Sequence, residues 1–160
     1  MIVQELLDRL CKAFEDHDGA AAAALFTEDC VYHDVFYGAF EGRKGIVALV
    51  DDWLYRHARD LDWDMFDPVS DGRNLYVRYI FTYVSTLPEA KGKRTGFEGV
   101  SLIRLENGLI ASYREIANTA PALLEAGFSP ERVAKIVARQ GEALRASRVR
   151  AAPPLSGDCR

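Results

Sequence analysis

The first third of the chain carries the apolar spacing of α-helices. Leucine, cysteine and phenylalanine return every three or four positions over residues 2–17, which predicts a helix with one apolar face. Asp18-Gly19 interrupts this spacing, and the alanine-rich segment 20–26 predicts a second, short helix. The same helical spacing of apolar residues recurs over residues 43–60, which predicts a third helix. Between these helices, only residues 30–35 have the pattern of a strand.

The middle of the chain has the pattern of an antiparallel sheet. Aromatic and β-branched residues crowd into residues 75–84, which predicts a strand there. Three further strands are expected over 61–69, 95–105 and 109–117. Glu106-Asn107-Gly108 joins the last two, and an Asn-Gly pair readily adopts the positive φ angles of a tight hairpin. These four strands in succession predict a meander.

Two helices close the predicted order. A short helix is expected over 120–126, and Ser129-Pro130 has the residues of an N-cap followed by proline at the first helical position. This last helix is expected to end near Arg145.

Helices segregated from a meander predict an α+β domain. We expect one domain over residues 1–146, with a curved, cone-shaped, mainly antiparallel (mixed) sheet wrapped around the N-terminal helices. Two extra helices follow that sheet. Residues 147–160 contain adjacent prolines and no periodicity, which predicts a disordered tail.

Composition narrows the class of protein. A length of 160 residues suits one domain with a real core, and 49% hydrophobic with 28% charged residues is ordinary for a globular protein. The net charge of −4 gives no reason to expect nucleic acid as a partner. Residues 129–160 nevertheless carry seven Lys/Arg against three Asp/Glu, so the last helix is basic.

Cysteine and histidine usage points to no metal. The three cysteines are odd in number and widely spaced, which favours reduced thiols in the cytoplasm. The three histidines have no ligand spacing. No signal peptide is recognisable, and no stretch approaches the about 18 uncharged apolar residues that a membrane span needs.

The segment from Leu25 to Gly42 carries the most specific signal. A polar turn at Thr27–Asp29 leads into the short strand, which stops at the carboxylate of Asp34. The chain then loops across Val35–Phe40 and enters the next helix. One acid therefore ends a strand beneath an aromatic loop, where it would be held as a base at the rim of an apolar cavity.

Three stretches together resemble a known superfamily. They are Phe26-Thr-Glu-Asp-Cys-Val-Tyr-His-Asp34, Phe40-Glu-Gly-Arg43 and Asn107-Gly-Leu-Ile-Ala-Ser-Tyr-Arg-Glu115. They are similar to those of ketosteroid isomerase, SnoaL-like polyketide cyclases, limonene epoxide hydrolase and nuclear transport factor 2, over roughly residues 3–118. The resemblance implies a conical pocket for a small apolar molecule and chemistry without a cofactor. It is specific for the fold and not for the reaction.

The resemblance also assigns candidate roles. Asp34 falls where ketosteroid isomerase keeps its general base, and Glu115 lies about where the epoxide hydrolase and some cyclases place an acid on the last strand. The chain departs from the isomerase at three positions. Val35 replaces the usual proline, and Leu10 and Ser101 stand where the isomerase has its two oxyanion donors.

Strand alternation extends the candidate site to a pocket lining. Tyr113 and Glu115 share one face of their strand, and the resemblance points that face into the cavity. The same reasoning points Arg78 and Ile80 inward, although the hydrolase's Arg-x-Asp motif is not matched there. The predicted lining is Tyr32, Phe36, Tyr37, Leu49, Trp53, Arg78, Ile80, Ser101 and Tyr113.

Two functions remain open at this point. Two carboxyl groups near an arginine can divide the roles of base and acid, which favours a small enzyme that moves a proton next to a carbonyl or adds water. Alternatively, Arg78 and Glu115 form a structural ion pair and Asp34 braces its loop. The protein would then be a non-catalytic binding module. A closed-ended pocket reached by both acids would favour the enzyme, and aromatic side chains filling it would oppose it.

The chain is also expected to form a homodimer. Residues 75–84 are apolar or aromatic on both faces of the strand, although one face should already line the pocket. Left bare, the other face would be a large apolar patch, so we expect the convex side of the sheet to pair two subunits.

Overall fold

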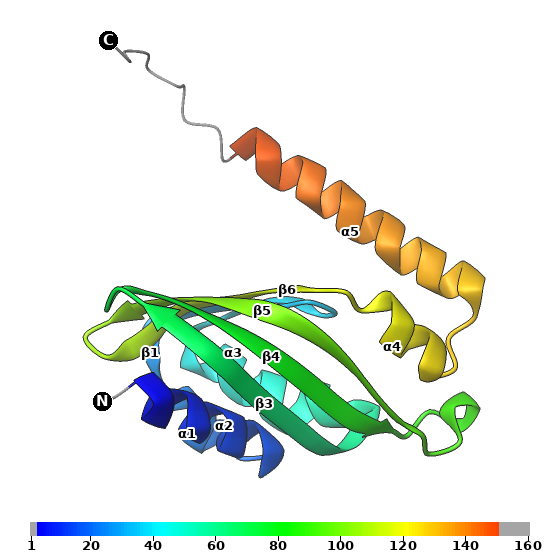
Figure 1. Ribbon diagram of the computed structural model, residues 1–160, viewed down its shortest axis with the longest axis horizontal. Helices are drawn as coiled ribbons and strands as arrows, with labels where there is room; N and C mark the ends of the chain where they lie inside the picture. Colours follow the sequence, from blue (N-terminus) through cyan, green and yellow to red (C-terminus); the bar gives the residue numbers. More distant parts are fainter. Residues whose placement is uncertain (1–2, 151–160) are drawn as a thin grey trace.

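The computed structural model describes residues 3–150, and Figure 1 shows a curved sheet with α1, α2 and α3 on one side and α5 on the other. The helices are α1 (Val3–Glu15), α2 (Gly19–Ala23), α3 (Gly42–Ala48), α4 (Ala120–Glu125) and α5 (Pro130–Arg150). The strands are β1 (Phe26–Asp34), β2 (Gly38–Glu41), β3 (Ala58–Ser70), β4 (Asn74–Ser85), β5 (Arg94–Glu106) and β6 (Leu109–Ala117).

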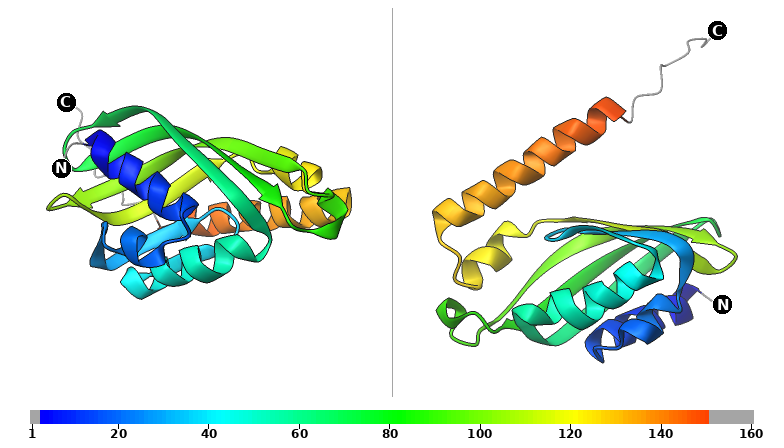
Figure 2. Two further views of the ribbon diagram at one scale, coloured as in Figure 1. Left: turned by 90° about the horizontal axis from the view of Figure 1, so that it is seen from below. Right: turned by 180° about the vertical axis from the view of Figure 1, so that it is seen from behind.

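The six strands form one mixed sheet in the order β2-β1-β6-β5-β4-β3. Strands β3 to β6 are the predicted antiparallel meander, and β1 pairs in parallel with β6. Figure 2 shows how strongly the sheet curves around α1 and α3. The expected fold class, an α+β cone, is confirmed.

A hairpin at β1 and β2 was not predicted. The carboxylate of Asp34 accepts hydrogen bonds at 2.8 Å from the backbone N–H groups of both Phe36 and Tyr37, which closes a tight turn. Gly38 follows with a φ of +89°, a value that glycine adopts without strain. The chain therefore reverses directly into β2 where a loop was expected. Strand β1 also begins earlier than predicted, at Phe26.

The helix expected over 43–60 is shorter and changes its winding. After α3 the chain continues as one π-helical stretch over Leu49–Trp53 and a 3₁₀ turn over Leu54–Arg56. The wider π turn places the carboxylate of Asp51 beside the start of α2, where it accepts the Gly19 N–H at 2.8 Å. That contact ties the third helix to the second.

The core fills the concave side of the sheet. Helix α1 contributes a fully apolar face that packs under β3, including Leu7, Leu10 and Phe14. Each such buried side chain stabilises the fold by about 1.5–3 kcal/mol. The sheet contributes mainly aromatic rings: Phe26, Tyr32, Trp63, Tyr79, Phe97 and Tyr113.

Helix α5 stands apart from this core. It leaves the body after α4 and runs past the expected end near Arg145 to Arg150. Among residues 130–146 of this helix, Val133 alone is buried, whereas Leu144 is 65% exposed. The predicted tail beyond this helix lies outside the described residues.

Candidate functional site

The two candidate acids lie on neighbouring strands. Strand β1 runs parallel to β6 with Tyr32 opposite Tyr113 and His33 opposite Arg114, so the next pair along the strands is Asp34 and Glu115. Both acids are partly buried on the concave side of the sheet. The same face of β6 and β5 presents Tyr113 and Ser101, as expected from strand alternation.

A group of hydroxyls surrounds the carboxyl of Glu115. The Tyr32 hydroxyl donates to Glu115 Oε1 at 3.0 Å. The Tyr32 ring stacks on Tyr113 with ring centroids 4.3 Å apart, and the Tyr113 hydroxyl shares a 2.6 Å hydrogen bond with Ser101 Oγ. Stacked rings and a buried hydrogen bond leave these hydroxyls little freedom to move. The carboxyl of Glu115 therefore sits in a preorganised polar site inside an apolar core.

Burial changes the acidity of both carboxyl groups. It raises the pKa of Glu115 to about 8, and the neighbouring charge of Asp34 adds to this rise while the Tyr32 and Tyr113 hydroxyls oppose it. Burial also raises the pKa of Asp34 to about 6, although the two backbone N–H groups of its turn hold the charged form. Both carboxyl groups therefore hold a proton more strongly than free carboxyl groups do, and the effect is larger for Glu115 than for Asp34.

Tyr79 belongs to the same cluster and was missed by the sequence analysis. Its side chain is buried, and its hydroxyl lacks a hydrogen bond of good geometry among the described residues. Burial, followed by the charge of Glu115, raises the pKa of this hydroxyl. Tyr79 pairs across the sheet with Gly99, where a Cβ would come within 2.7 Å of the Tyr79 oxygen. Only glycine at that position leaves room for the ring.

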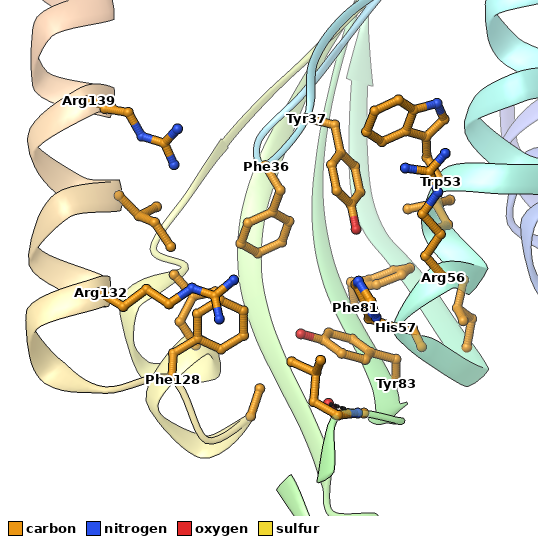
Figure 3. A pocket seen from close by; sticks show the side chains of 18 residues that line it. Phe36, Tyr37, Trp53, Arg56, His57, Phe81, Tyr83, Phe128, Arg132 and Arg139 are labelled. Carbon is orange, nitrogen blue, oxygen red and sulfur yellow. Dashed lines mark hydrogen bonds between the residues drawn. The ribbon is translucent and has the colours of Figure 1, made fainter. Parts of the chain in front are cut away.

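A cavity of about 380 Å³ opens beside this cluster, at the end of the sheet nearest α4 and α5 (Figure 3). Phe36, Tyr37 and Trp53 line it, as predicted, together with residues of β4, α4 and α5. Neither Asp34 nor Glu115 lines it. This cavity is therefore not the predicted pocket reached by both acids.

Comparison with known proteins places this fold in a family. A model of the SnoaL-like domain matches residues 7–113, which is more than half of the chain. The chain belongs to the SnoaL-like domain family. A search of the curated proteins finds no match to it.

Solved structures share the fold of this SnoaL-like protein at low sequence identity. A Catenulispora acidiphila protein with a ketosteroid isomerase-like fold, solved with trimethylamine, has a TM-score of 0.70 at 16% identity, covering 78% of this chain and 94% of its own. A Mycobacterium tuberculosis epoxide hydrolase has 0.62 at 13%, covering 84% and 94%. A candidate polyketide cyclase from Xanthomonas campestris has 0.63 at 19%, covering 77% and 95%.

Two predicted lining residues of the SnoaL-like domain point the other way. Arg78 and Ile80 lie on the outer face of β4, where Ile80 is 37% exposed and Arg78 is within 3.9 Å of Asp67 and 3.8 Å of Glu98. The inward placement of Arg78 and Ile80 is therefore wrong, and so is the alternative of an Arg78–Glu115 ion pair. Both errors have one cause, an incorrect choice of which β4 residues face the core.

One further predicted lining residue lies in the core. Leu49 is fully buried and packs within the hydrophobic cluster, away from the cavity. Within residues 3–150, no three His, Cys, Asp or Glu side chains gather as metal ligands would. None of the helices in the same range has both the length and the apolar content of a membrane span.

Proposed function

We propose that this SnoaL-like protein is a small enzyme that needs no cofactor and carries out acid–base chemistry on an apolar, oxygenated molecule. One observation carries the proposal. Two carboxyl groups share a buried, tyrosine-lined site, and burial raises the pKa of Glu115 further than that of Asp34. Acids whose environments separate their pKa values are suited to opposite roles in proton transfer. Structural neighbours described as a cyclase and an epoxide hydrolase support this class of reaction.

In the proposed reaction, the ionised Asp34 removes a proton from a carbon next to a carbonyl. The electron pair left on carbon moves to the carbonyl oxygen, where protonated Glu115 supplies a proton. The hydroxyls of Tyr32 and Tyr79 lie near that carboxyl and would stabilise the developing oxyanion. This assignment uses Ser101 only to orient Tyr113.

Substrate would reach the acids through the Asp34 turn. The backbone N–H groups of Phe36 and Tyr37 bind Asp34, while the side chains of the same two residues line the cavity. The Phe36 ring also packs edge to face against the core residue Phe97, with the two ring centroids 5.4 Å apart. A molecule in the cavity must displace the Phe36 ring before its reacting carbon meets Asp34.

A second function is favoured by the cavity itself. Because neither carboxyl lines it, the protein could bind a small molecule there without transforming it. In that case the two acids and their tyrosines only satisfy one another inside the core.

Proton transfer can be tested without knowing the substrate. The protein is incubated with a panel of apolar ketones in D₂O, and exchange of the hydrogens next to each carbonyl is followed by NMR. Asp34→Asn retains the acceptor oxygen for the turn and loses the base, so exchange should slow by about 100-fold or more while the fold is kept. The matched control is Glu98→Gln on the outer face of the sheet, which should exchange at the wild-type rate. Equal rates for wild type and Asp34→Asn, with the ketones still bound, would favour the binding module.

A further inference from the structure

The basic character of the last helix has no role in the acid–base site. Helix α5 supplies Arg132 and Arg139 to the wall of the cavity, and Arg56 supplies a third guanidinium group from the opposite side. Figure 3 shows Arg132 and Arg139 projecting from α5 toward the rings of Phe36 and Tyr37. Cationic groups therefore converge on an aromatic cavity from two separate parts of the chain.

These guanidinium groups are not neutralised. No aspartate or glutamate is among the residues that line the cavity, and none of the three arginines forms an ion pair with a described side chain. Two of them are held by aromatic rings instead. Arg56 lies over Trp53 at 4.1 Å from the ring centroid, and Arg132 lies over Phe128 at 4.0 Å. A stacked guanidinium keeps its N–H donors free for an anion.

The floor of the cavity adds neutral polar groups to an apolar surface. Figure 3 shows the hydroxyls of Tyr37 and Tyr83 directed into the same space. Burial raises the pKa of the Tyr83 hydroxyl to about 12, and burial also raises the pKa of Tyr37. Both hydroxyls are therefore neutral donors and acceptors at neutral pH. The rings of Phe36 and Phe81 supply flat apolar walls.

We propose that the cavity binds an amphiphilic anion, whose apolar and preferably aromatic body packs between Phe36 and Phe81 and whose carboxylate or phosphate is held by Arg132 and Arg139. Planar guanidinium groups bind both head groups through paired, charge-assisted hydrogen bonds. Three uncompensated cations at the rim also disfavour a positively charged ligand. The inference rests on the proposed function, because it names the substrate class for the cavity through which substrate would reach the two acids.

The size of the cavity fits this class of ligand. A volume of about 380 Å³ is within the usual range of small-molecule sites, near its lower end. A body of one or two fused rings with one head group is therefore the expected size. Helix α5 then has a function in recognition, through Arg132 and Arg139 in the cavity wall.

The test uses four probes with one naphthalene body: 2-naphthoate, 2-naphthyl phosphate, 2-naphthamide and 2-naphthylmethylammonium. Binding to the full chain is measured by calorimetry at fixed ionic strength. Both anions should bind about tenfold or more tightly than the neutral amide, and the ammonium should bind most weakly. The ranking of carboxylate against phosphate identifies the head group.

Variants assign the selectivity to the named residues. Arg132→Met with Arg139→Met should lower the affinity for both anions to that for the amide and leave amide binding unchanged. Lys135→Met removes the same charge from the same helix without lining the cavity, and should keep wild-type selectivity. Arg139→Met alone leaves the Arg132–Phe128 contact intact and should give an intermediate loss of anion affinity. This single variant keeps the proposal testable if the double variant folds poorly.

Two results would overturn the inference: equal affinity for amide and anions, or an equal loss in Lys135→Met and in the arginine variants. The outcome is separable from that of the acid–base proposal. Anion-selective binding that persists in Asp34→Asn, with no proton exchange in the wild type, would support the inference and contradict the proposed acid–base activity. Proton exchange on neutral ketones without anion selectivity would support the acid–base activity and contradict anion binding in the cavity.

Discussion

The carboxyl cluster at β1 and β6 and the cavity beneath α5 are built in opposite ways. The cluster is acidic, enclosed and made from neighbouring strands, so its geometry follows from the register of the sheet. The cavity is basic, open and assembled from a turn, the end of β4 and the two C-terminal helices. Asp34 lies inside the stretch that matches the SnoaL-like family, whereas Arg132 and Arg139 lie beyond it. The matched stretch ends at residue 113, so it contains Asp34 but neither Glu115 nor the arginines of α5.

The largest effect that separates the two regions should be the pH dependence of stability at Glu115. Burial raises the pKa of Glu115 to about 8 in the folded protein, above the ordinary value of 4.5 for a glutamate in an unfolded chain. Between these values the folded state binds more protons, so the free energy of unfolding falls as pH rises. Glu115→Gln cannot ionise and loses this slope. Relative to wild type, we expect it to gain about 3.5 kcal/mol between pH 5 and pH 8.

Urea unfolding at several pH values measures this difference. Arg132→Met serves as the control from the cavity and should follow the wild-type curve. Parallel curves for wild type and Glu115→Gln would mean that Glu115 is ionised in the folded protein at neutral pH. The division of roles between the two acids would then be wrong.

The second-largest effect should be a loss of ligand affinity when α5, which forms one wall of the cavity, changes position. Gly127 ends α4 with a φ of +88°, and a Cβ there would come within 2.6 Å of the Glu89 Cβ and 2.8 Å of its backbone carbon. Gly127→Ala should therefore shift α5 and weaken binding of 2-naphthoate by about tenfold. Gly108→Ala has a similar φ of +78° and open space around the Cβ, so it should cost stability of about 1 kcal/mol and no affinity.

Calorimetry with 2-naphthoate and thermal unfolding of both glycine variants separate the two effects. Neither variant should change the pH dependence that Glu115 confers. Equal losses of affinity in Gly127→Ala and Gly108→Ala would show that the position of α5 does not matter for binding.

The accuracy of the sequence analysis depended on how each pair of strands is joined. Strands β5 and β6 meet at Asn107-Gly108, where φ is +52° and +78°, and such a tight turn fixes their register. The inward placement of Ser101, Tyr113 and Glu115 followed correctly. Between β4 and β5 the chain runs through a 3₁₀ turn over Pro88–Ala90, so no local signal fixes the register.

That missing register explains the error on β4. Both faces of this strand carry apolar residues, so alternation alone cannot choose between them. The structure pairs Val77 with Ser101, which directs Val77 and Tyr79 inward and leaves Arg78 outside. A reader of the sequence could have found Tyr79 only after fixing that pairing. The contribution of α5 to the cavity also depends on packing between distant segments, which periodicity does not contain.

The smallest effect on either region should come from the outer face of the sheet, where we still predict that two copies pair. Val69 is 68% exposed and Ile116 is 60% exposed, and Tyr76, Ile80 and Val100 are exposed beside them. An apolar patch of this kind is typical of an interface. Ile116→Glu places a charge in this patch and should turn a dimer into a monomer in sedimentation equilibrium. Since residue 116 points away from the concave side, affinity for 2-naphthoate should change by no more than about twofold.

A wild-type monomer at micromolar concentration would contradict the dimer. A large loss of affinity in the monomeric variant would instead mean that the second copy helps to form the cavity, and the two regions would then no longer be separate parts of one chain.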